Sequence, residues 1–532
     1  MDDFFNIPEL RALVCDRLDR KSAYAFALTR RAFREEGLNR VWRSIDTFEP
    51  LFSYLPGDLL VETSVPVMST RLPRAVMCLR RPLVREDLQK YLDYAKEIQE
   101  VKIDIYHCKR LPATDLMHAL ELAIGGEAGA LSPNIKCFKA MPGVPFKTDL
   151  LKSLAPLTPL FVGNNLERLG VMLRAKLEIH TAIALSTFHF APQLKALTFS
   201  EKSEGPLITQ YMGSSSWENL QSFSAPTCPS ISLLASLPQL RSLRLTNVQV
   251  SDIPIEAPSQ GEGVHESQNL GFQSIQEMEI QAETFLILHE FIRRLPTSNM
   301  IRSLKLSTYN YASPEDIENI IANIRARGNP HTLVCLQVID GVLDEATREG
   351  QMAVGEPDMM SEEPVDLWYH EDVDVLPTTF DFTNLEVLVL RFRERIRVTP
   401  EDLASIPETW PRLSRFEVTE TGPRGQLPLI DHNDLLHFVE RCPYLRVLGL
   451  PFDATRISGG ERSSQGPFHL ESLCVVGSPI CSPYCVVEFI LSNFPELKEM
   501  EIAFEDLANN YSDSMTVCRW ARVRRDAVWR LR

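Results

Sequence analysis

The chain has 532 residues, of which 44% are hydrophobic and 24% charged, a composition typical of a folded globular protein. A formal net charge of −16 and a pI near 5.3 argue against nucleic acid as the main partner. The sequence has no signal-peptide pattern, no apolar run long enough to span a membrane and no paired spacing among its eleven cysteines, so we expect a cytoplasmic or nuclear protein that binds no membrane.

Residues 1–48 predict a small helical head. Pro8 suits the first turn of a helix, and Ser22 is expected to cap a second one. Gly37 is expected to separate a third short helix that carries Trp42. The first helix has an apolar stripe formed by Leu10, Leu13, Val14 and Leu18. So small a unit is marginal alone, so this stripe must pack either on the rest of the chain, as an end cap, or on another protein.

The head resembles an F-box, the short module by which substrate receptors of SCF ubiquitin ligases attach to the Skp adaptor. Ile7, Pro8 and Leu10 stand at the family's Leu-Pro opening, with isoleucine in place of leucine. Residues 29–31, Thr-Arg-Arg, depart from a Cys-Lys or Cys-Arg pair that is common there. The resemblance implies a set of adaptor-binding residues: Ile7, Pro8, Leu10, Leu13, Leu18, Leu28, Phe33 and Trp42. Through the Skp adaptor the chain would join a cullin.

Residues 49–97 are expected to form a helical linker or an N-terminal cap. Three further segments, 81–95, 410–413 and 441–450, resemble parts of fungal F-box-like repeat proteins. This second resemblance implies no ligand.

From residue 98 to residue 505 one six-residue repeat motif recurs: an apolar residue, two free positions, an apolar residue, one free position and a last apolar residue. The clearest copies begin at Leu240, Leu385 and Leu445. Looser copies begin at Ile98, Ile135, Leu166, Leu194, Leu220, Ile275, Ile301, Leu333, Leu413, Leu470 and Leu497, which makes fourteen starts. Recurrence at intervals of mostly 20 to 37 residues indicates a solenoid, in which each repeat packs on its neighbours.

The motif is typical of a β-strand, in which successive side chains point to opposite faces. In the copy at Leu240 we expect Leu243 and Leu245 to point inward and Arg244 outward. Helix-like stretches with apolar residues three and four apart lie between the motifs, for example at 314–324. The motif resembles that of leucine-rich-repeat proteins, although the family's asparagine after the last leucine is missing. We therefore predict an α/β fold: an irregular leucine-rich-repeat solenoid, with parallel strands inside and helices outside, behind the head.

The strand face of the solenoid is the expected target-binding surface, because its outward positions are displayed in register. The candidates are Lys102, Arg168, Arg244, Glu279, Lys305, Arg391 and Glu417. Their mixed charges suit a protein surface better than a nucleic acid. An F-box followed by leucine-rich repeats implies a substrate receptor that holds an unidentified target protein while other subunits transfer ubiquitin.

Two segments interrupt or follow the repeats. Between Asp340 and Asp374 there are twelve acidic residues and one basic residue, Arg348, which predicts a solvated acidic insert at about 340–380. Residues 506–532 are basic and predict a helix that either covers the far end of the solenoid or contacts an acidic partner.

We find no sequence signature of an enzyme. His289 and Glu290 lack a second histidine four residues on, and the spacing of Cys474, Cys481 and Cys485 does not match a zinc knuckle. We therefore expect no catalytic residue, no metal and no cofactor. Two other interpretations stay open: a scaffold whose helical head is only a solenoid cap, and a ligand sensor, which would require a deep apolar pocket.

Overall fold

The computed structural model describes residues 7–65, 74–104, 108–141, 157–173, 188–201, 203–252, 271–342, 372–420, 427–502 and 515–531. Within them the chain has an α/β fold and divides into two compact units. Unit 1 comprises Met1–Pro229 and Leu237–Gln239, and unit 2 comprises Ser230–Ser236 and Leu240–Arg532. Because the repeat motif continues through this division, the sequence analysis had no feature that indicated it.

Unit 1 contains a helical start, a run of parallel strands and a small second sheet. Its elements are α1 (Pro8–Arg17), α2 (Arg20–Thr29), η2 (Arg31–Phe33), α3 (Arg34–Trp42), β1 (Ser44–Ile45), α4 (Glu49–Tyr54), β2 (Leu60–Val65), β3 (Arg74–Leu79), η3 (Arg85–Leu88), α5 (Gln89–Ala95), β4 (Glu100–Asp104), β5 (Arg110–Pro112), α6 (Thr114–Ile124), β6 (Cys137–Met141), α8 (Leu157–Phe161), β7 (Arg168–Val171), η4 (Phe188–Gln193), β8 (Ala196–Phe199), α10 (Gly205–Gly213) and β9 (Ser222–Ala225).

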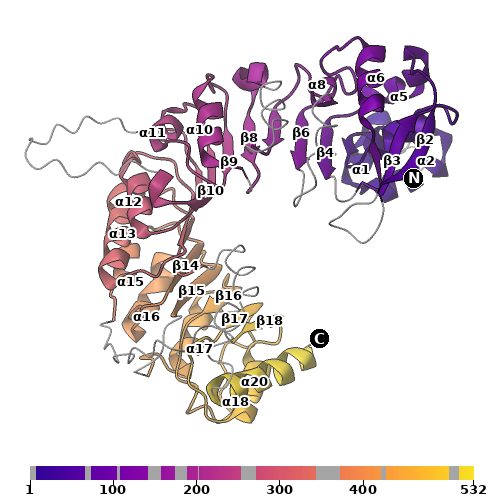
Figure 1. Cartoon of the computed structure of the whole chain (residues 1–532). Helices are drawn as coiled ribbons and strands as arrows, with labels where there is room; N and C mark the ends of the chain where they lie inside the picture. Colours follow the sequence, from indigo (N-terminus) through magenta and orange to yellow (C-terminus); the bar gives the residue numbers. More distant parts are fainter. Residues whose placement is uncertain are drawn as a thin grey trace, which may run out of the picture. The chain divides into compact units, whose positions relative to one another are not determined.

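Unit 2 repeats strand and helix to its end. Its elements are α11 (Ile231–Ser236), β10 (Ser242–Val248), η5 (Val250–Asp252), β11 (Glu277–Ala282), α12 (Phe285–Arg293), β12 (Ser303–Thr308), α13 (Pro314–Arg327), β13 (Cys335–Ile339), α15 (Leu376–Thr379), β14 (Val387–Phe392), α16 (Pro400–Thr409), β15 (Arg415–Glu420), α17 (His432–Arg441), β16 (Val447–Gly449), β17 (Ser472–Cys474), α18 (Pro483–Asn493), β18 (Glu499–Glu501) and α20 (Met515–Leu531). In this unit the helices lie on one side of the strands (Figure 1).

The parallel strands follow the predicted repeat motif. In sheet order they run β1-β4-β6-β7-β8-β9 in unit 1 and β10 through β18 in unit 2. After each of the fourteen motif starts a strand begins two residues later, and all fourteen starting side chains are at most 3% exposed. In β10 the side chains of Leu243 and Leu245 are buried and Arg244 is exposed, as expected. The predicted α/β architecture with a long series of parallel strands is confirmed.

Successive repeats are joined by the same backbone contact. The carbonyl oxygen of the residue after the motif start accepts two N–H groups from the next repeat; that of Gln99, for example, accepts from Lys136 at 2.7 Å and from Cys137 at 3.0 Å. The carbonyls that do this in the two units belong to Arg43, Gln99, Lys136, Glu167, Lys195, Arg241, Gln276, Arg302, Val334, Glu386, Ser414, Arg446 and Glu471. Strand stacking therefore satisfies backbone groups as well as burying the apolar positions.

Asparagine side chains add a second ladder at the same edge of the strands. Asn165 donates through Nδ2 to the carbonyl of Pro133 at 3.0 Å, one repeat earlier in the chain. The same bond is made by Asn134 to Lys96, by Asn219 to Pro192 and by Asn384 to His331. Each of these asparagines directly precedes a motif start, so the repeats do use asparagine, at a position where the sequence analysis did not look for it.

The helical head packs tightly, and two details of its prediction are wrong. The N-cap of α2 is Asp19, whose carboxylate accepts the N–H of Ser22 at 2.7 Å, so the helix begins before Ser22. Gly37 separates nothing, because it lies inside α3 against α2. A Cβ at Gly37 would stand 2.7 Å from the Cβ of Ala27 and 2.9 Å from the carbonyl oxygen of Ala23. Any larger residue would force α2 and α3 apart.

The head continues directly into the sheet of unit 1. Trp42 is 5% exposed and stacks on Tyr94 with ring centroids 5.0 Å apart. Directly after Trp42, β1 pairs in parallel with β4, and the Arg43 carbonyl receives the two N–H groups described above. Trp42 thus occupies the first apolar position of a shortened repeat, which the sequence analysis did not recognise.

The prediction of a helical linker at 49–97 is wrong in its middle. Strands β2 and β3 are antiparallel there, and β5 joins β3 in parallel to make a separate three-stranded sheet. Val61, Thr63 and Val76 are β-branched residues, which favour a strand. Arg110 of β5 forms an ion pair with Glu49 of α4, which ties this sheet to the helices around it.

At the other end, α20 packs on α18 and on β18. Trp520 is 1% exposed, and its indole N–H donates to the Ser478 carbonyl at 2.7 Å. The side chain of Arg519 donates to the Ile480 carbonyl at 2.9 Å. The basic stretch is therefore helical, as predicted, and its apolar side covers the last repeat.

Candidate protein-binding surfaces

Exposed apolar side chains gather on the first two helices of the head. Ile7, Leu13, Tyr24 and Leu28 are 46%, 61%, 53% and 70% exposed. In the described part of the chain fifteen large apolar side chains are at least 37% exposed, and four of them fall within residues 7–28. Tyr24 and Leu28 are four residues apart and so share a face of α2. These four residues therefore define a candidate docking surface on the head.

The orientation of α1 explains the exposure of its predicted apolar stripe. Arg11, whose side chain is 14% exposed, forms an ion pair with Glu36 of α3 at 2.7 Å, and Cys15 one turn on is buried. Residues 11 and 15 thus face α3, and Leu13 projects away from it. Leu10, Val14 and Leu18 are half-buried. The stripe is therefore not the core of the head.

Besides the half-buried Leu10 and Leu18, the adaptor candidates form an exposed set and a buried set. Pro8 is exposed together with Ile7, Leu13 and Leu28, whereas Phe33 and Trp42 are buried. For the last two, the expected adaptor contact is corrected, because their side chains are occupied within unit 1. Phe33 stacks on Phe26 at 4.4 Å, and Trp42 stacks on Tyr94.

The second candidate surface is the strand face of unit 2. One row of outward positions runs in register across nine strands. Its members, from β10 to β18, are Arg244, Glu279, Lys305, Gln337, Val389, Glu417, Gly449, Cys474 and Glu501. Of these, Arg244, Glu279, Lys305 and Glu417 were predicted from the sequence and the rest were not, although all stand at the same free position of the motif.

The first part of this row is open to solvent. Arg244 and Glu279 form an ion pair at 3.3 Å, with side chains 58% and 42% exposed. Lys305, on the next strand, lies in register with Glu279 and is half-buried. These charges alternate in sign and are spaced one strand apart. They can bind a polar protein surface that carries complementary charges.

The last part of the row is closed by an ionic cluster, which we define as Arg391, Arg415, Glu417 and Glu501. Glu417 lies 2.8 Å from Arg415 and 3.4 Å from Arg391, and its side chain is only 4% exposed. Arg391 also reaches Glu501, four strands away, at 3.4 Å.

Small side chains make the cluster possible. A Cβ at Gly449 would stand 2.9 Å from the Cγ of Glu417 and 3.2 Å from the Cβ of Cys474, so only glycine fits beneath the buried carboxylate. Burial also raises the pKa of Glu501 above its ordinary value. For Glu417 the expected role as a displayed target contact is corrected, because the carboxylate is enclosed.

In unit 1 the two remaining candidates lie on the same side of β4 and β7, which are separated by β6. Lys102 of β4 is exposed and forms an ion pair with Glu100 at 2.9 Å. Arg168 of β7 is 57% exposed and lies 3.8 Å from Glu100. The register places Glu100, Cys137 and Arg168 in one row. Both cations are thus displayed on the strand face.

The predicted acidic insert is described only at its ends, since residues 343–371 lie outside the described ranges. Asp340, at the first end, is 3% exposed and accepts backbone N–H groups from Ala312 at 3.0 Å and from Arg393 at 2.9 Å. Burial raises the pKa of Asp340 to about 6. Asp372, at the second end, lies 3.6 Å from Arg395. Both ends of the insert therefore bond to residues of the loop that follows β14.

The described residues also bear on metal sites, membrane-spanning helices and reactive thiols. No group of three His, Cys, Asp or Glu side chains there could hold a metal ion, and no helix there is long and apolar enough to cross a membrane. Burial raises the pKa of the Cys442 thiol to about 12 and that of Cys474 further, which disfavours the reactive thiolate.

Comparison with known proteins gives no assignment. No protein-family model matches the chain, and no curated protein matches it significantly.

Proposed function

We propose that the chain is the substrate-recognition subunit of an SCF-type ubiquitin ligase, an F-box protein whose head binds the Skp adaptor and whose leucine-rich-repeat strands bind a target protein. The observation that carries this proposal is the exposure of Leu13, Tyr24 and Leu28 on two helices that otherwise pack into unit 1. Exposed apolar side chains on a helical module are typical of a surface that docks on another protein.

The exposed leucines can supply a useful part of the docking energy. Full burial of a leucine side chain is worth about 1.5 to 3 kcal/mol, so covering the exposed part of Leu13 or Leu28 is worth about 1 to 2 kcal/mol each. Together they would change an adaptor affinity by about thirtyfold or more.

The strand faces would hold the target. The open row of Arg244, Glu279 and Lys305, and the displayed Lys102 and Arg168, offer charges of both signs to a protein surface. The chain itself would contribute proximity and orientation, while the other subunits of the ligase perform ubiquitin transfer.

A second candidate function, a scaffold whose head is only an end cap, is favoured by one observation. The stack of Trp42 on Tyr94 and the pairing of β1 with β4 make the end of the head part of the unit 1 sheet. The receptor and the scaffold differ in what they require of α1 and α2. A receptor needs exposed leucines there to bind the adaptor, whereas an end cap does not.

The test is co-purification of the tagged full-length chain with Skp adaptor from cells. A Leu13→Asp, Leu28→Asp double variant should lose the adaptor. The matched control is Leu122→Asp, which places the same change at an 81% exposed leucine on α6 of the same unit. Adaptor recovery that is equal for wild type and double variant, or absent from both, would contradict the proposal and favour the scaffold.

A further inference from the structure

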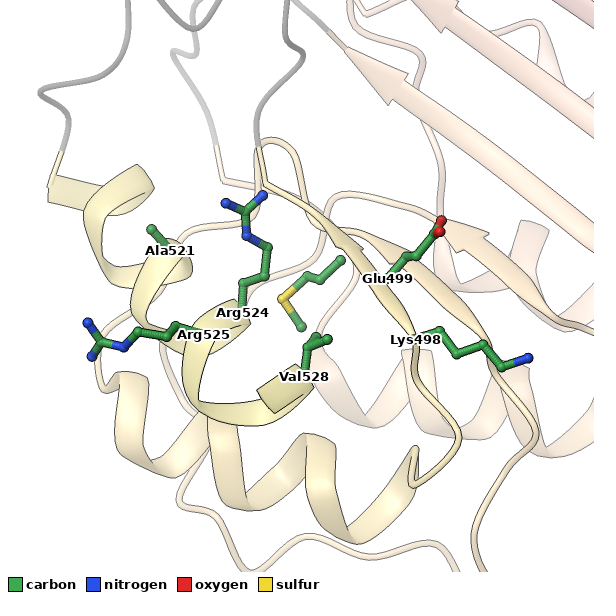
Figure 2. A pocket seen from close by; sticks show the side chains of 7 residues that line it. Lys498, Glu499, Ala521, Arg524, Arg525 and Val528 are labelled. Carbon is green, nitrogen blue, oxygen red and sulfur yellow. The ribbon is translucent and has the colours of Figure 1, made fainter. Parts of the chain in front are cut away.

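The groove between β18 and α20 is a further candidate binding site, separate from both surfaces described above. It has a volume of about 420 Å³ and is lined by Lys498, Glu499, Met500, Ala521, Arg524, Arg525 and Val528. Figure 2 shows Arg524 and Val528 projecting from α20 toward β18, with Lys498 and Arg525 extending to either side. The floor is apolar, and three of the four charged lining residues are cations.

The strand that borders this groove, β18, is the last in its sheet and has backbone groups that are not bonded to β17. The Glu499 N–H donates to the Glu471 carbonyl at 3.1 Å, and the Glu501 carbonyl accepts from the Val475 N–H at 2.9 Å. In a parallel pair, alternate residues bond to the same neighbour, so the N–H and C=O of Met500 point away from β17. They are placed to bond an added strand, as in recognition by strand addition.

The charge of the groove selects the kind of segment that fits. Helix α20 carries five arginines and one aspartate, in a chain whose net charge is −16. Arg525 and Lys498 pair with Asp526 and Glu471, at 3.0 and 2.7 Å. Arg524 is exposed and makes no ion pair within the described residues. It is the cation available to an incoming anion.

The apolar floor argues for a protein segment over a nucleic acid. Met500 and Val528 are buried and Ala521 is half-buried, so the floor accepts an apolar side chain. Trp520, which directly precedes the lining residue Ala521, is buried against Phe452 and cannot stack on a base. We propose that this groove binds an extended, acidic protein segment with apolar anchors, which adds to β18 and places a carboxylate on Arg524.

The test uses the full-length chain and a fluorescein-labelled peptide in which glutamate alternates with leucine, followed by anisotropy. Arg524→Glu should weaken binding about tenfold, a change that corresponds to about 1.4 kcal/mol. Arg522→Glu is the matched control, since it makes the same charge change on α20 at a residue that does not line the groove, and it should change binding less than twofold. Ala521→Leu, which fills the groove, should also weaken binding.

Several outcomes would overturn the inference. They are equal losses in the Arg524 and Arg522 variants, no binding of the acidic peptide, equal binding of a lysine-leucine peptide, tighter binding of single-stranded RNA, or occupation of the groove by a second copy of the chain. The proposal does not depend on the ligase function. Adaptor binding by the Arg524→Glu variant should be unchanged whether or not the peptide binds.

Discussion

The ionic cluster of unit 2 gives a prediction whose size follows from the geometry. Arg391→Met keeps most of the side-chain volume but removes the cation between Glu417 and Glu501. Removing one partner from a buried ion pair costs about 3 to 5 kcal/mol, because the other charge stays buried. Arg391 is 23% exposed, and Arg415 still holds Glu417 at 2.8 Å. We therefore expect a loss of about 2 kcal/mol in the free energy of unfolding.

A second substitution distinguishes the cost of an unpaired buried charge from a simple loss of packing. Adding Glu417→Met to Arg391→Met removes the buried charge and leaves Arg415 and Glu501, whose side chains are 42% and 39% exposed, in contact with water. The double variant should recover about 1 kcal/mol or more relative to the single one.

The assay is urea unfolding followed by tryptophan fluorescence, which reports on the buried Trp410 and Trp520 of unit 2. Arg412→Met is the control, because Arg412 pairs with Glu386 at 2.9 Å on the surface with its side chain 78% exposed, and it should cost about 0.5 kcal/mol or less. If Arg391→Met is no worse than this control, or if the double variant is no more stable than the single one, the reasoning is refuted.

Two further predictions concern stability. Asn165→Ala should cost about 1 kcal/mol, because it removes the bond to Pro133, while Asn164→Ala beside it should be close to neutral; equal effects in urea unfolding would argue against the asparagine ladder. For Asp340, burial raises the folded-state pKa from 3.8 to about 6, so the folded state binds more protons between these pH values. Stability of the wild type relative to Asp340→Asn should therefore fall as the pH rises from 4 to 6, by about 3 kcal/mol at most, and a pH-independent difference would contradict this.

The repeats were predictable because a strand that packs on two neighbours must bury every second side chain. That constraint places apolar residues at fixed spacing, and all fourteen motif starts precede a strand. The shortened repeat at Trp42 escaped notice because β1 has only two residues and lacks the last apolar position. The β2–β3 pair was not predicted because it is antiparallel and lies outside the repeat motif.

The strand-face surface was only partly predictable from sequence. Motif position tells which side chains point outward, and it placed Arg244, Glu279 and Lys305 correctly on the open row. It does not tell which outward positions stay exposed. Glu417 is enclosed because Arg391 crosses the small residues Gly449 and Cys474 to reach Glu501, a contact between residues 110 positions apart.

Hydrogen exchange on the purified full-length chain, with and without purified Skp adaptor, tests the central claim most directly. Docking on the exposed side chains of α1 and α2 should slow exchange of the amides of Pro8–Arg17 and Arg20–Thr29 when adaptor is added. The Leu122→Asp variant should show the same protection, and the Leu13→Asp, Leu28→Asp variant should show none. Adaptor that protects neither helix in the wild type would contradict the proposed function.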